Sequence, residues 1–368
     1  MNTLRYLYID DEDVESLNAI IDGFNDIESI VVELFPLDTT KSFDELKANL
    51  LDRLGEFDGL ILDLRLDGEG PNRVGFSAPT IAQDLRTLSA RKEIKSFPIV
   101  LCSTEPKIKE TYNADKSSHN LFDYKFEKSE EIDYVKFSRK LKSLAFWYKW
   151  FDNQDKNINE VFARQDLNGI DSRIYDRFLN TDTTPLPTDY SKFIINNLFH
   201  HPGALIKERT LAARLGIDIE KSSDWARLRD EVLTCCKYEG LFNDGWKRWW
   251  ADKLILFFKE ISDNASLSYL NAEQRVKILQ EKTSLTNLVP ATPIKYCVST
   301  EFWTICEGYK KPLDPLEGFI VYEKDEIKPW QESKYISFDA VIERVGQEKG
   351  LKPHPSEVDN ISEFKESL

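Results

Sequence analysis

The chain has 368 residues, a formal net charge of −15 and a hydrophobic share of 41%. That share is enough for sizeable cores, so global disorder is excluded, and the length predicts two or three domains. The negative charge does not favour binding to nucleic acid, which relies on a positive field. No signal peptide precedes the first predicted strand, and no apolar run reaches the roughly 18 residues that span a bilayer, so we expect a cytoplasmic protein with no membrane partner.

Short apolar runs alternate with helical periods in the first third of the chain. The runs predict strands at residues 4–9, 30–36, 59–64, 98–102 and 121–126. Apolar residues at helical spacing predict helices at residues 14–24, 42–54 and 78–88. Buried strands separated by helices are typical of a parallel sheet covered on both faces. The pattern therefore predicts an α/β fold, a doubly wound five-stranded parallel sheet.

The rest of the chain is predicted to be mainly α-helical with a few short strands. A long helix is expected at residues 132–151, and the clearest linker is Asn180–Thr188. Further helices are predicted at residues 190–200, 207–215, 224–238, 246–261, 271–283 and 338–346, and short strands at 294–298 and 318–322. We expect four regions: a first domain at residues 1–130, a helical connector at 131–180, a mainly helical interaction domain at 189–350 and a flexible tail at 351–368.

Polar side chains gather at the points where the predicted strands end. Asp10 and Asp11 follow the first strand, and Asp63 ends the third. Ser103 follows the fourth strand and Lys128 follows the fifth. In doubly wound folds, function collects at the carboxyl ends of the strands, so we expect these five side chains to meet.

The segments around these residues resemble those of CheY-like response-regulator receiver domains. Tyr8–Glu12 resembles the acidic pair that opens such receivers, and Phe57–Leu66 resembles the segment that carries their phosphorylated Asp. Pro98–Ser103 resembles the strand that ends in their switch Ser or Thr, and Phe126–Ser129 resembles the segment with their active-site Lys. Each motif alone is weak, but all four occur in order and at the correct strand ends. The resemblance covers about residues 3–130, a third of the chain.

The resemblance implies a flavodoxin-like receiver in which Asp63 is the phosphoryl acceptor. The donor would be a histidine kinase or a phosphotransfer protein, as in two-component systems and phosphorelays. Lys128 would pair with the phosphoryl oxygens, and Ser103 would donate a hydrogen bond to them. Lys125 is the alternative active-site lysine, in which case Phe122 takes the place of the aromatic switch residue.

The resemblance also implies a Mg²⁺ site. Asp11, Asp63 and the backbone carbonyl of Arg65 would supply oxygen ligands, and Asp10 would act through water. Mg²⁺ prefers octahedral oxygen ligands and keeps several waters. Clustered carboxylates repel one another, so such a site favours a divalent cation.

The sequence departs from the receiver pattern at several positions. Asp67 stands where a Pro is usual, and Ser129 replaces the Pro that usually follows the Lys. Lys125 stands at the place of the aromatic output switch, and the loop from Asp63 to Gly75 is longer than usual. These departures leave the phosphorylation chemistry intact. They do not favour the standard output route through the last strand and helix.

The C-terminal two thirds contain no Gly-rich phosphate loop, nucleophile elbow or His-based triad. Lys207–Gly216 superficially resembles the start of a helix-turn-helix, but the helix predicted at 224–238 is not basic. His200 and His201 lack a third ligand at a recognisable spacing, and we interpret them as capping or surface residues. We interpret Trp246–Trp250 as part of a helix that buries its Trp residues.

The sequence leaves three functional hypotheses open. The favoured one is a signalling protein, not an enzyme, whose phosphorylation at Asp63 switches a non-DNA-binding C-terminal domain. That domain would bind a protein partner or self-associate. The alternative is a receiver-fold scaffold that works with a partner ATPase and without phosphorylation. The third is an unrecognised C-terminal enzyme that the receiver gates.

Overall fold

The computed structural model describes residues 3–68, 70–104, 120–128, 132–152, 157–179 and 186–366. By its internal contacts the chain divides into two compact units, which we describe one by one. Unit 1 comprises Met1–Val161, Thr181–Ile195 and Leu241–Trp246. Unit 2 comprises Phe162–Asn180, Asn196–Gly240 and Lys247–Leu368. Ser129, one of the departures from the receiver pattern, lies outside the described residues.

Unit 1 is built on a five-stranded sheet. Its strands are β1 (Leu4–Ile9), β2 (Ile30–Leu34), β3 (Gly59–Leu62), β4 (Ile99–Thr104) and β5 (Tyr124–Lys128). They lie in the order β2-β1-β3-β4-β5, and all neighbours are parallel. This is the strand order of flavodoxin-like folds, CheY among them, in which ligands bind beyond the strand ends where the order reverses. The predicted α/β fold is confirmed.

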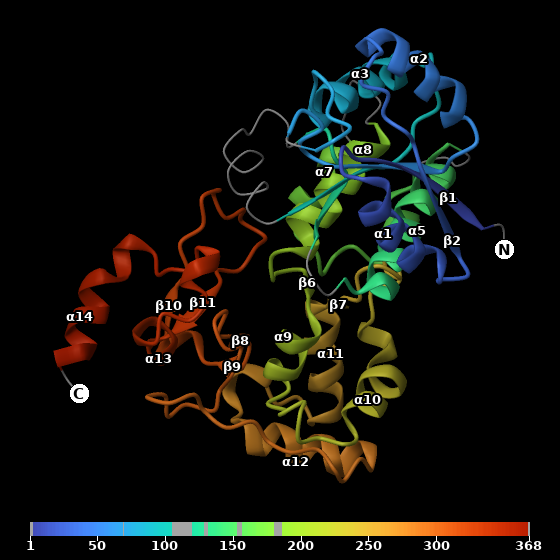
Figure 1. The fold of residues 1–368 in the computed structure, drawn as a ribbon. Coiled ribbons are helices and arrows are strands. Elements are labelled where there is room, and N and C mark those ends of the chain that lie inside the picture. Colours follow the sequence, from blue (N-terminus) through green and yellow to red (C-terminus); the bar gives the residue numbers. More distant parts are fainter. Residues whose placement is uncertain are drawn as a thin grey trace. The chain divides into compact units, whose positions relative to one another are not determined.

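Two helices cover one face of this sheet, α2 (Phe43–Leu54) and α3 (Ala78–Ala90) (Figure 1). Leu46 and Leu50 of α2 are buried in the same apolar cluster as Ile81 of α3. Because strand side chains alternate between faces, every second residue of the central strands joins this cluster. This layer is one half of the predicted doubly wound arrangement.

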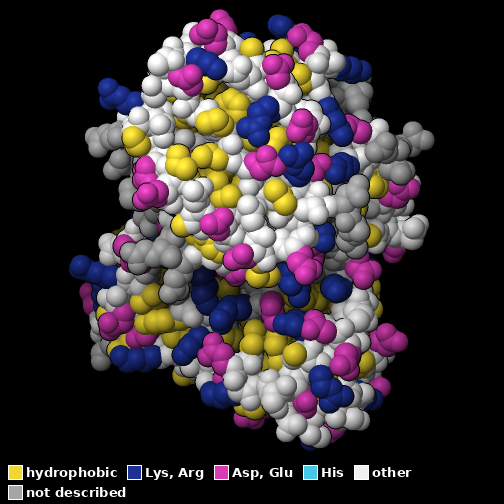
Figure 2. Space-filling view, turned by 45° about the vertical axis from the view of Figure 1, so that its right-hand side comes forward, with side chains coloured by type: hydrophobic (Ala, Val, Ile, Leu, Met, Phe, Trp, Pro, Cys, Tyr) yellow, Lys and Arg dark blue, Asp and Glu magenta, His cyan; other side chains and the backbone are white. Residues whose placement is uncertain are grey.

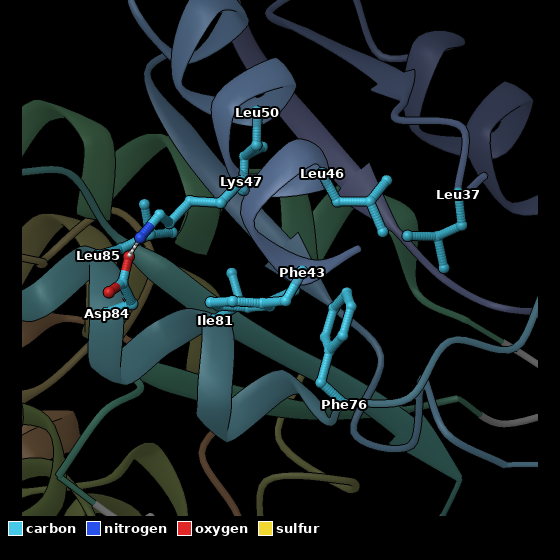
Figure 3. Close-up of a pocket in the computed structure, with 9 residues that line it drawn as sticks. All are labelled: Leu37, Phe43, Leu46, Lys47, Leu50, Phe76, Ile81, Asp84 and Leu85. Atoms are coloured by element: carbon cyan, nitrogen blue, oxygen red, sulfur yellow. Dashed lines mark ion pairs between the residues drawn. The ribbon is translucent and has the colours of Figure 1, made fainter. Parts of the chain in front are cut away.

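The space between α2 and α3 forms a small apolar recess (Figure 3). Beside it the Lys47 ammonium pairs with the Asp84 carboxylate at 3.4 Å. The recess has a volume of about 10 Å³, room for about one water molecule. It is therefore a packing gap and not a ligand site.

The opposite face of the sheet is covered by α1 (Val14–Asn25) and α5 (Tyr134–Phe151) (Figure 1). The Phe24 ring of α1 meets the Tyr134 ring edge to face, with centroids 5.0 Å apart. It also meets Phe126 of β5 at 6.1 Å. These aromatic contacts join both helices to the last strand of the sheet.

Two segments from far along the chain complete unit 1. The first is α8 (Pro187–Lys192), where the Trp147 indole N–H donates to the Pro187 carbonyl at 2.9 Å and the Trp147 ring meets Tyr190 at 5.5 Å. The second is Leu241–Trp246. Both pack on the side of α5 that carries Trp147. The long helix predicted at residues 132–151 therefore buries a second face within unit 1.

A buried polar network ties α8 to the base of the sheet. The Asp123 carboxylate, which is 1% exposed, accepts hydrogen bonds from Arg86 at 2.6 Å, Tyr148 at 2.7 Å and Ser191 at 2.5 Å. It also accepts one from the Ile99 backbone N–H at 2.9 Å. A buried charge is stable only when it is paired and hydrogen-bonded, and Asp123 meets both conditions.

Unit 2 contains a short antiparallel sheet with two helical segments between its strands. In chain order its elements are β6 (Leu205–Ile206), α9 (Glu208–Arg214), α10 (Trp225–Arg227), η5 (Leu228–Val232), η6 (Leu233–Cys236), β7 (Trp249–Trp250), α11 (Ala251–Ile261) and α12 (Ala272–Thr283). β6 pairs with β7, and Lys237 forms an isolated bridge to Trp249.

Another apolar cluster lies near the C-terminus. It contains residues of β9 (Pro312–Leu313), β10 (Gly318–Ile320), β11 (Tyr335–Ser337), α13 (Phe338–Ile342) and α14 (Val358–Glu366). The strand β8 (Thr304–Ile305) pairs with β9. Within 351–368, where we expect a flexible tail, Ile361 of α14 is 9% exposed and Phe364 meets Phe338 at 4.3 Å. Short helices elsewhere are α6 (Ile158–Val161), α7 (Asp176–Leu179) and the π-helical η4 (Phe193–Phe199).

Two predicted elements are wrong. The strand predicted at 294–298 is irregular, because Tyr296 has a φ of 69°, and Val298 is 87% exposed. The helix predicted to begin at Trp246 begins at Ala251, because Trp249 and Trp250 form β7. Among the described residues, no helix is both long and apolar enough to cross a bilayer.

Candidate functional site

Three carboxylates meet where β1 and β3 end. Asp10 and Asp11 follow β1 directly, and Asp63 follows β3, its neighbour in the sheet. One oxygen from each carboxylate lies within 4.8 Å of the other two, and none of the three residues is more than 2% exposed. Three like charges this close and this dry repel one another, so the group needs a positive partner.

Lys128, the last residue of β5, supplies positive charge. Its Nζ lies 2.5 Å from Asp10 Oδ2 and 3.0 Å from Asp63 Oδ1. Burial alone would lower the pKa of Lys128, but the Asp63 and Asp10 carboxylates outweigh that effect and raise it. The ammonium is therefore charged at neutral pH. Lys125, the alternative lysine, is exposed to solvent, so the geometry favours Lys128 as the lysine of this site.

Nearby donors fix the orientation of the carboxylates. The Arg65 backbone N–H donates to Asp63 Oδ2 at 3.0 Å, and the Glu12 backbone N–H donates to Asp10 Oδ1 at 3.1 Å. The Tyr8 hydroxyl donates to Asp10 Oδ2 at 2.5 Å. Burial raises the pKa of Tyr8 well above its ordinary value, which keeps it a donor. Charge-assisted hydrogen bonds of this kind are about twice as strong as neutral ones.

Ser103 lies on the other side of Asp63 from the acidic pair. It belongs to β4, and the order β1-β3-β4 places β3 between Ser103 and Asp10–Asp11. Ser103 is fully buried, and its hydroxyl has no hydrogen-bond partner among the described residues. A buried polar group without a partner is costly, so such a group calls for a ligand or another explanation.

The loop after β3 reaches across to the acidic pair. The Gly70 backbone N–H donates to Asp11 Oδ2 at 3.2 Å, and the Asn72 side chain donates to the Glu12 carbonyl at 3.0 Å. A Cβ on Gly70 would stand 2.3 Å from the Asp11 carbonyl oxygen, so only Gly fits. The sequence indicated an unusually long loop, but nothing in its pattern predicted this contact.

The donor set fits Mg²⁺. Asp10, Asp11 and Asp63 offer only oxygen, which Mg²⁺ prefers. Opposite ligands of one Mg²⁺ are about 4.2 Å apart, so oxygens spread over up to 4.8 Å can share an ion after small side-chain movements or through water. The position of a Gly68 Cβ would lie 3.2 Å from the Arg65 carbonyl oxygen and 3.4 Å from Asp11 Oδ2. The predicted carbonyl ligand and the Asp11 carboxylate therefore face the same point beside Gly68.

The other candidates from the sequence lie in different surroundings. His201 Nε2 is 2.8 Å from Glu323 Oε1, and the Lys334 ammonium is 2.6 Å from the same oxygen. His201 therefore belongs to a cluster of charged side chains and not to a group of metal ligands. In the part of the chain that is described, the three aspartates are the one group close enough to share an ion.

The Trp residues of the segment 246–250 are buried as expected, although Trp249 and Trp250 lie in the strand β7 and not in a helix. Trp246, Trp249 and Trp250 are at most 5% exposed. The segment of α10, η5 and η6, which follows α9, does not form a basic surface. Its Arg229 pairs with Glu208 at 2.6 Å and also pairs with the neighbouring Asp230. Positive and negative side chains are interspersed over the face seen in Figure 2.

Comparisons with known proteins give structural similarity only. No protein-family model matches the chain, and no curated protein matches its sequence. A chain from the co-crystal structure of the Saccharomyces cerevisiae histidine phosphotransfer signaling protein Ypd1 and the receiver domain of its downstream response regulator Ssk1 is similar, with a TM-score of 0.28 and 15% identity, over 39% of this chain and 90% of that chain. The response regulator domain of Thermotoga maritima CheB is similar, with a TM-score of 0.26 and 13% identity, over 42% of this chain and all of that chain. The receiver-type fold of unit 1 rests on its strand order.

Proposed function

We propose that unit 1 is a phosphorylation switch in which Asp63 accepts a phosphoryl group from a phosphohistidine. The donor would be a histidine kinase or a phosphotransfer protein. The observation that carries the proposal is the meeting of three buried carboxylates with the Lys128 ammonium at the carboxyl end of a flavodoxin-like sheet. Phosphoryl transfer asks a protein mainly for positioning and charge neutralisation, and this arrangement offers both.

The position of Asp63 supports its role as acceptor. It stands at the end of β3, between the acidic pair after β1 and Ser103 on β4. Its two carboxylate oxygens are held by the Lys128 ammonium and by the Arg65 backbone N–H. A phosphoryl group on Asp63 would therefore have the acidic pair on one side and a hydroxyl donor on the other.

The reaction is a displacement at phosphorus. An Asp63 oxygen attacks the phosphorus of a phosphohistidine, a new O–P bond forms, and the P–N bond breaks with its electron pair returning to the imidazole. Bound Mg²⁺, held by Asp10, Asp11, Asp63 and the Arg65 carbonyl, would neutralise negative charge on the phosphoryl oxygens. Lys128 would exchange its contact with Asp63 for a phosphoryl oxygen, and Ser103 would donate to another.

The test is phosphorylation of the purified full-length chain by a small phosphodonor, read by intact mass. We expect a gain of one phosphoryl group in the presence of Mg²⁺, its loss in a chelator, and its cleavage by hydroxylamine, which attacks acyl phosphates. Asp63→Asn should show no gain. Asp44→Asn is the matched control, because Asp44 is an exposed aspartate on α2 of the same unit. A gain that persists in Asp63→Asn, or no gain from any phosphohistidine donor, would refute the proposal.

The departures from the receiver pattern do not favour an output route through the last strand and helix, yet β5 and α5 carry contacts that offer such a route. Tyr124, at the other end of β5, accepts a hydrogen bond from Lys140 of α5 at 2.5 Å. The Trp246 ring meets the Tyr124 ring edge to face at 5.3 Å, and the Lys140 ammonium lies 5.4 Å from the Trp246 centroid. Trp246 is 5% exposed, so this contact is well packed.

This route supports the second half of the proposal, that phosphorylation changes the interactions of unit 2. The segment Leu241–Trp246 belongs to unit 1 by its contacts, yet unit 2 residues flank it on both sides in the sequence. The Gly245 backbone N–H donates to the Ser143 hydroxyl at 2.9 Å, which holds the segment on α5. A movement of β5 that follows Lys128 would therefore be felt by a segment that is covalently continuous with unit 2.

One observation favours a second candidate, a scaffold that binds a partner ATPase without phosphorylation. Gly70 and Lys128 already hold the carboxylates of Asp11, Asp10 and Asp63 from within the chain. If these contacts are permanent, the site has no use for an ion. Calorimetric titration with Mg²⁺ separates the two candidates, since the switch predicts binding that Asp11→Asn abolishes and the scaffold predicts none.

A further inference from the structure

Unit 2 contains an open cleft that no part of the proposed switch uses. Its volume is about 890 Å³, within the range of about 300–1,000 Å³ that is typical of small-molecule sites. The lining comes from residues 196–207, which run from the end of η4 to the start of α9, from Glu307, from residues 321–334 between β10 and β11, and from residues 349–351. Four stretches that are separate in the sequence therefore converge on one concave surface.

The acids at the inner end of the cleft are neutralised from within the protein. Glu323 pairs with the Lys334 ammonium at 2.6 Å and with His201 at 2.8 Å. These hydrogen bonds lower the pKa of Glu323 to about 2 against the raising effect of burial. Glu307 pairs with Lys310. The remaining lining acids, Asp325 and Glu326, are exposed residues on the outer loop.

Several cations of the cleft have no acid of their own. Among the described residues, no ion pair within 4.0 Å is found for Lys207, Lys324 or Lys349, all of which line the cleft. The positive charge of Arg248 also acts on Lys207, although Arg248 does not line the cleft and donates its hydrogen bonds to the Phe199 and Lys247 carbonyls. The lining carries five lysines against four acids, a small positive balance in a chain whose net charge is −15.

The cations crowd one another at Lys207. Its place inside the cleft, with the positive charges of Arg248 and Lys334, lowers its pKa to about 8, although Glu307 opposes the shift. The like charges around Lys207 repel its ammonium. An anion bound beside it would offset that repulsion.

We propose that this cleft binds a phosphate-bearing small molecule, whose phosphate group sits against Lys207. The volume admits a mononucleotide, and Tyr322 lines the same cleft as an aromatic surface for an apolar or aromatic moiety. Phosphate suits the site because lysine and arginine are the residues that recognise it best. The proposal is independent of phosphorylation at Asp63.

The test is calorimetric titration of the full-length chain at low salt with ATP, pyrophosphate and inorganic phosphate as separate probes. We expect saturable binding with one site per chain. Lys207→Ala should weaken it by at least about tenfold, the loss of one charge-assisted contact. Lys207→Arg should retain most of it. Lys259→Ala is the matched control, an exposed lysine on α11 outside the cleft, and should change the affinity by less than about twofold.

Three outcomes would overturn the proposal. One is the absence of saturable binding by all three probes. A second is equal weakening by Lys207→Ala and Lys259→Ala, which would mean non-specific attraction. The third is tighter, length-dependent binding of a single-stranded oligonucleotide than of ATP. Circular dichroism and thermal unfolding of each variant establish that a loss of binding is not a loss of folding.

Discussion

Lys128 is the residue on which the charge balance of the acidic site depends. Its ammonium contacts Asp10 and Asp63, while both carboxylates are buried beside Asp11. We predict that Lys128→Met lowers the free energy of unfolding by about 3–5 kcal/mol without divalent ions, because it leaves buried charges uncompensated. Millimolar Mg²⁺ should recover a large part of the loss. Urea unfolding with and without Mg²⁺ measures both effects.

Lys149→Met is the control for this substitution. Lys149 is also a lysine of unit 1 that pairs with an aspartate, Asp58 at 2.6 Å, but its side chain is 43% exposed. Exposed ion pairs contribute less than about 1 kcal/mol, so this variant should be nearly as stable as the wild type. Similar losses in both variants, or no effect of Mg²⁺ on Lys128→Met, would contradict the charge balance described for the site.

Glu323 makes the stability of the protein depend on pH in a way that can be measured. Burial alone would raise its pKa, but hydrogen bonds from His201 and Lys334 lower it from 4.5 to about 2. Because the folded-state pKa is the lower one, the stabilisation is complete above about pH 4.5 and is lost as the pH falls towards 2. A pKa shift of this size contributes at most about 3 kcal/mol to the free energy of unfolding.

We predict that Glu323→Gln is less stable than the wild type at neutral pH and that the two converge on acidification. Urea unfolding between about pH 6 and about pH 2.5 would follow the convergence. Glu326→Gln is the control, because Glu326 is 89% exposed and should show no pH-dependent difference. A constant difference between Glu323→Gln and the wild type across this range would rule out the ion pair as its cause.

At the scale of elements, the segment Leu241–Trp246 is the connection that the proposed switch needs. Trp246 packs on Tyr124 at the start of β5, the strand that ends in Lys128. We predict that Trp246→Ala leaves the phosphorylation of Asp63 unchanged but abolishes the effect of phosphorylation on hydrogen exchange in unit 2. The measurement is hydrogen–deuterium exchange of phosphorylated and unphosphorylated protein.

Phe146→Ala is the matched aromatic truncation for this experiment. Phe146 lies on α5 as well but is 60% exposed, so its loss should alter neither phosphorylation nor its effect on exchange. If Trp246→Ala responds to phosphorylation as the wild type does, the signal does not pass through this segment. If Trp246→Ala is not phosphorylated, the segment acts on the site itself and the proposed route is wrong.

The elements of unit 1 were predictable because their signal is local. Leu4–Ile9 and Gly59–Leu62 are short apolar runs, and such runs between helices are typical of a buried parallel strand. Trp249–Trp250 has no such signal. These residues continue the apolar spacing of α11, and only their pairing with Leu205–Ile206 makes them a strand. Pairing between distant segments leaves no trace in local periodicity.

The same distinction holds for the site. Asp10, Asp63 and Lys128 could be predicted to meet, because parallel strands end at one edge and each residue ends a strand. The contact of Gly70 with Asp11 could not be predicted, because the two residues are 59 positions apart in the sequence and meet only through the path of the loop after β3. The cleft of unit 2 was not predicted for a similar reason, since its lining comes from four separate stretches.

At the scale of the whole molecule, phosphorylation must supply enough free energy to shift the chain from one conformational state to the other. Moving a two-state equilibrium from 1:99 to 99:1 needs about 5.5 kcal/mol. A charge-assisted hydrogen bond contributes about 1.5–3 kcal/mol, so new contacts from Lys128 and Ser103 could supply a large share. Lys128 must first give up its contact with Asp63, which reduces that share. We therefore expect binding of a protein partner or self-association to complete the switch.

The central claim is that the phosphoryl group resides on Asp63 and on no other carboxylate of the site. Borohydride reduces an acyl phosphate to an alcohol, so a phosphorylated aspartate becomes homoserine and can be located by tandem mass spectrometry of its peptide. The account predicts homoserine at position 63, dependent on Mg²⁺ and on the phosphodonor. Homoserine at position 10 or 11, or at none of the three, would contradict it.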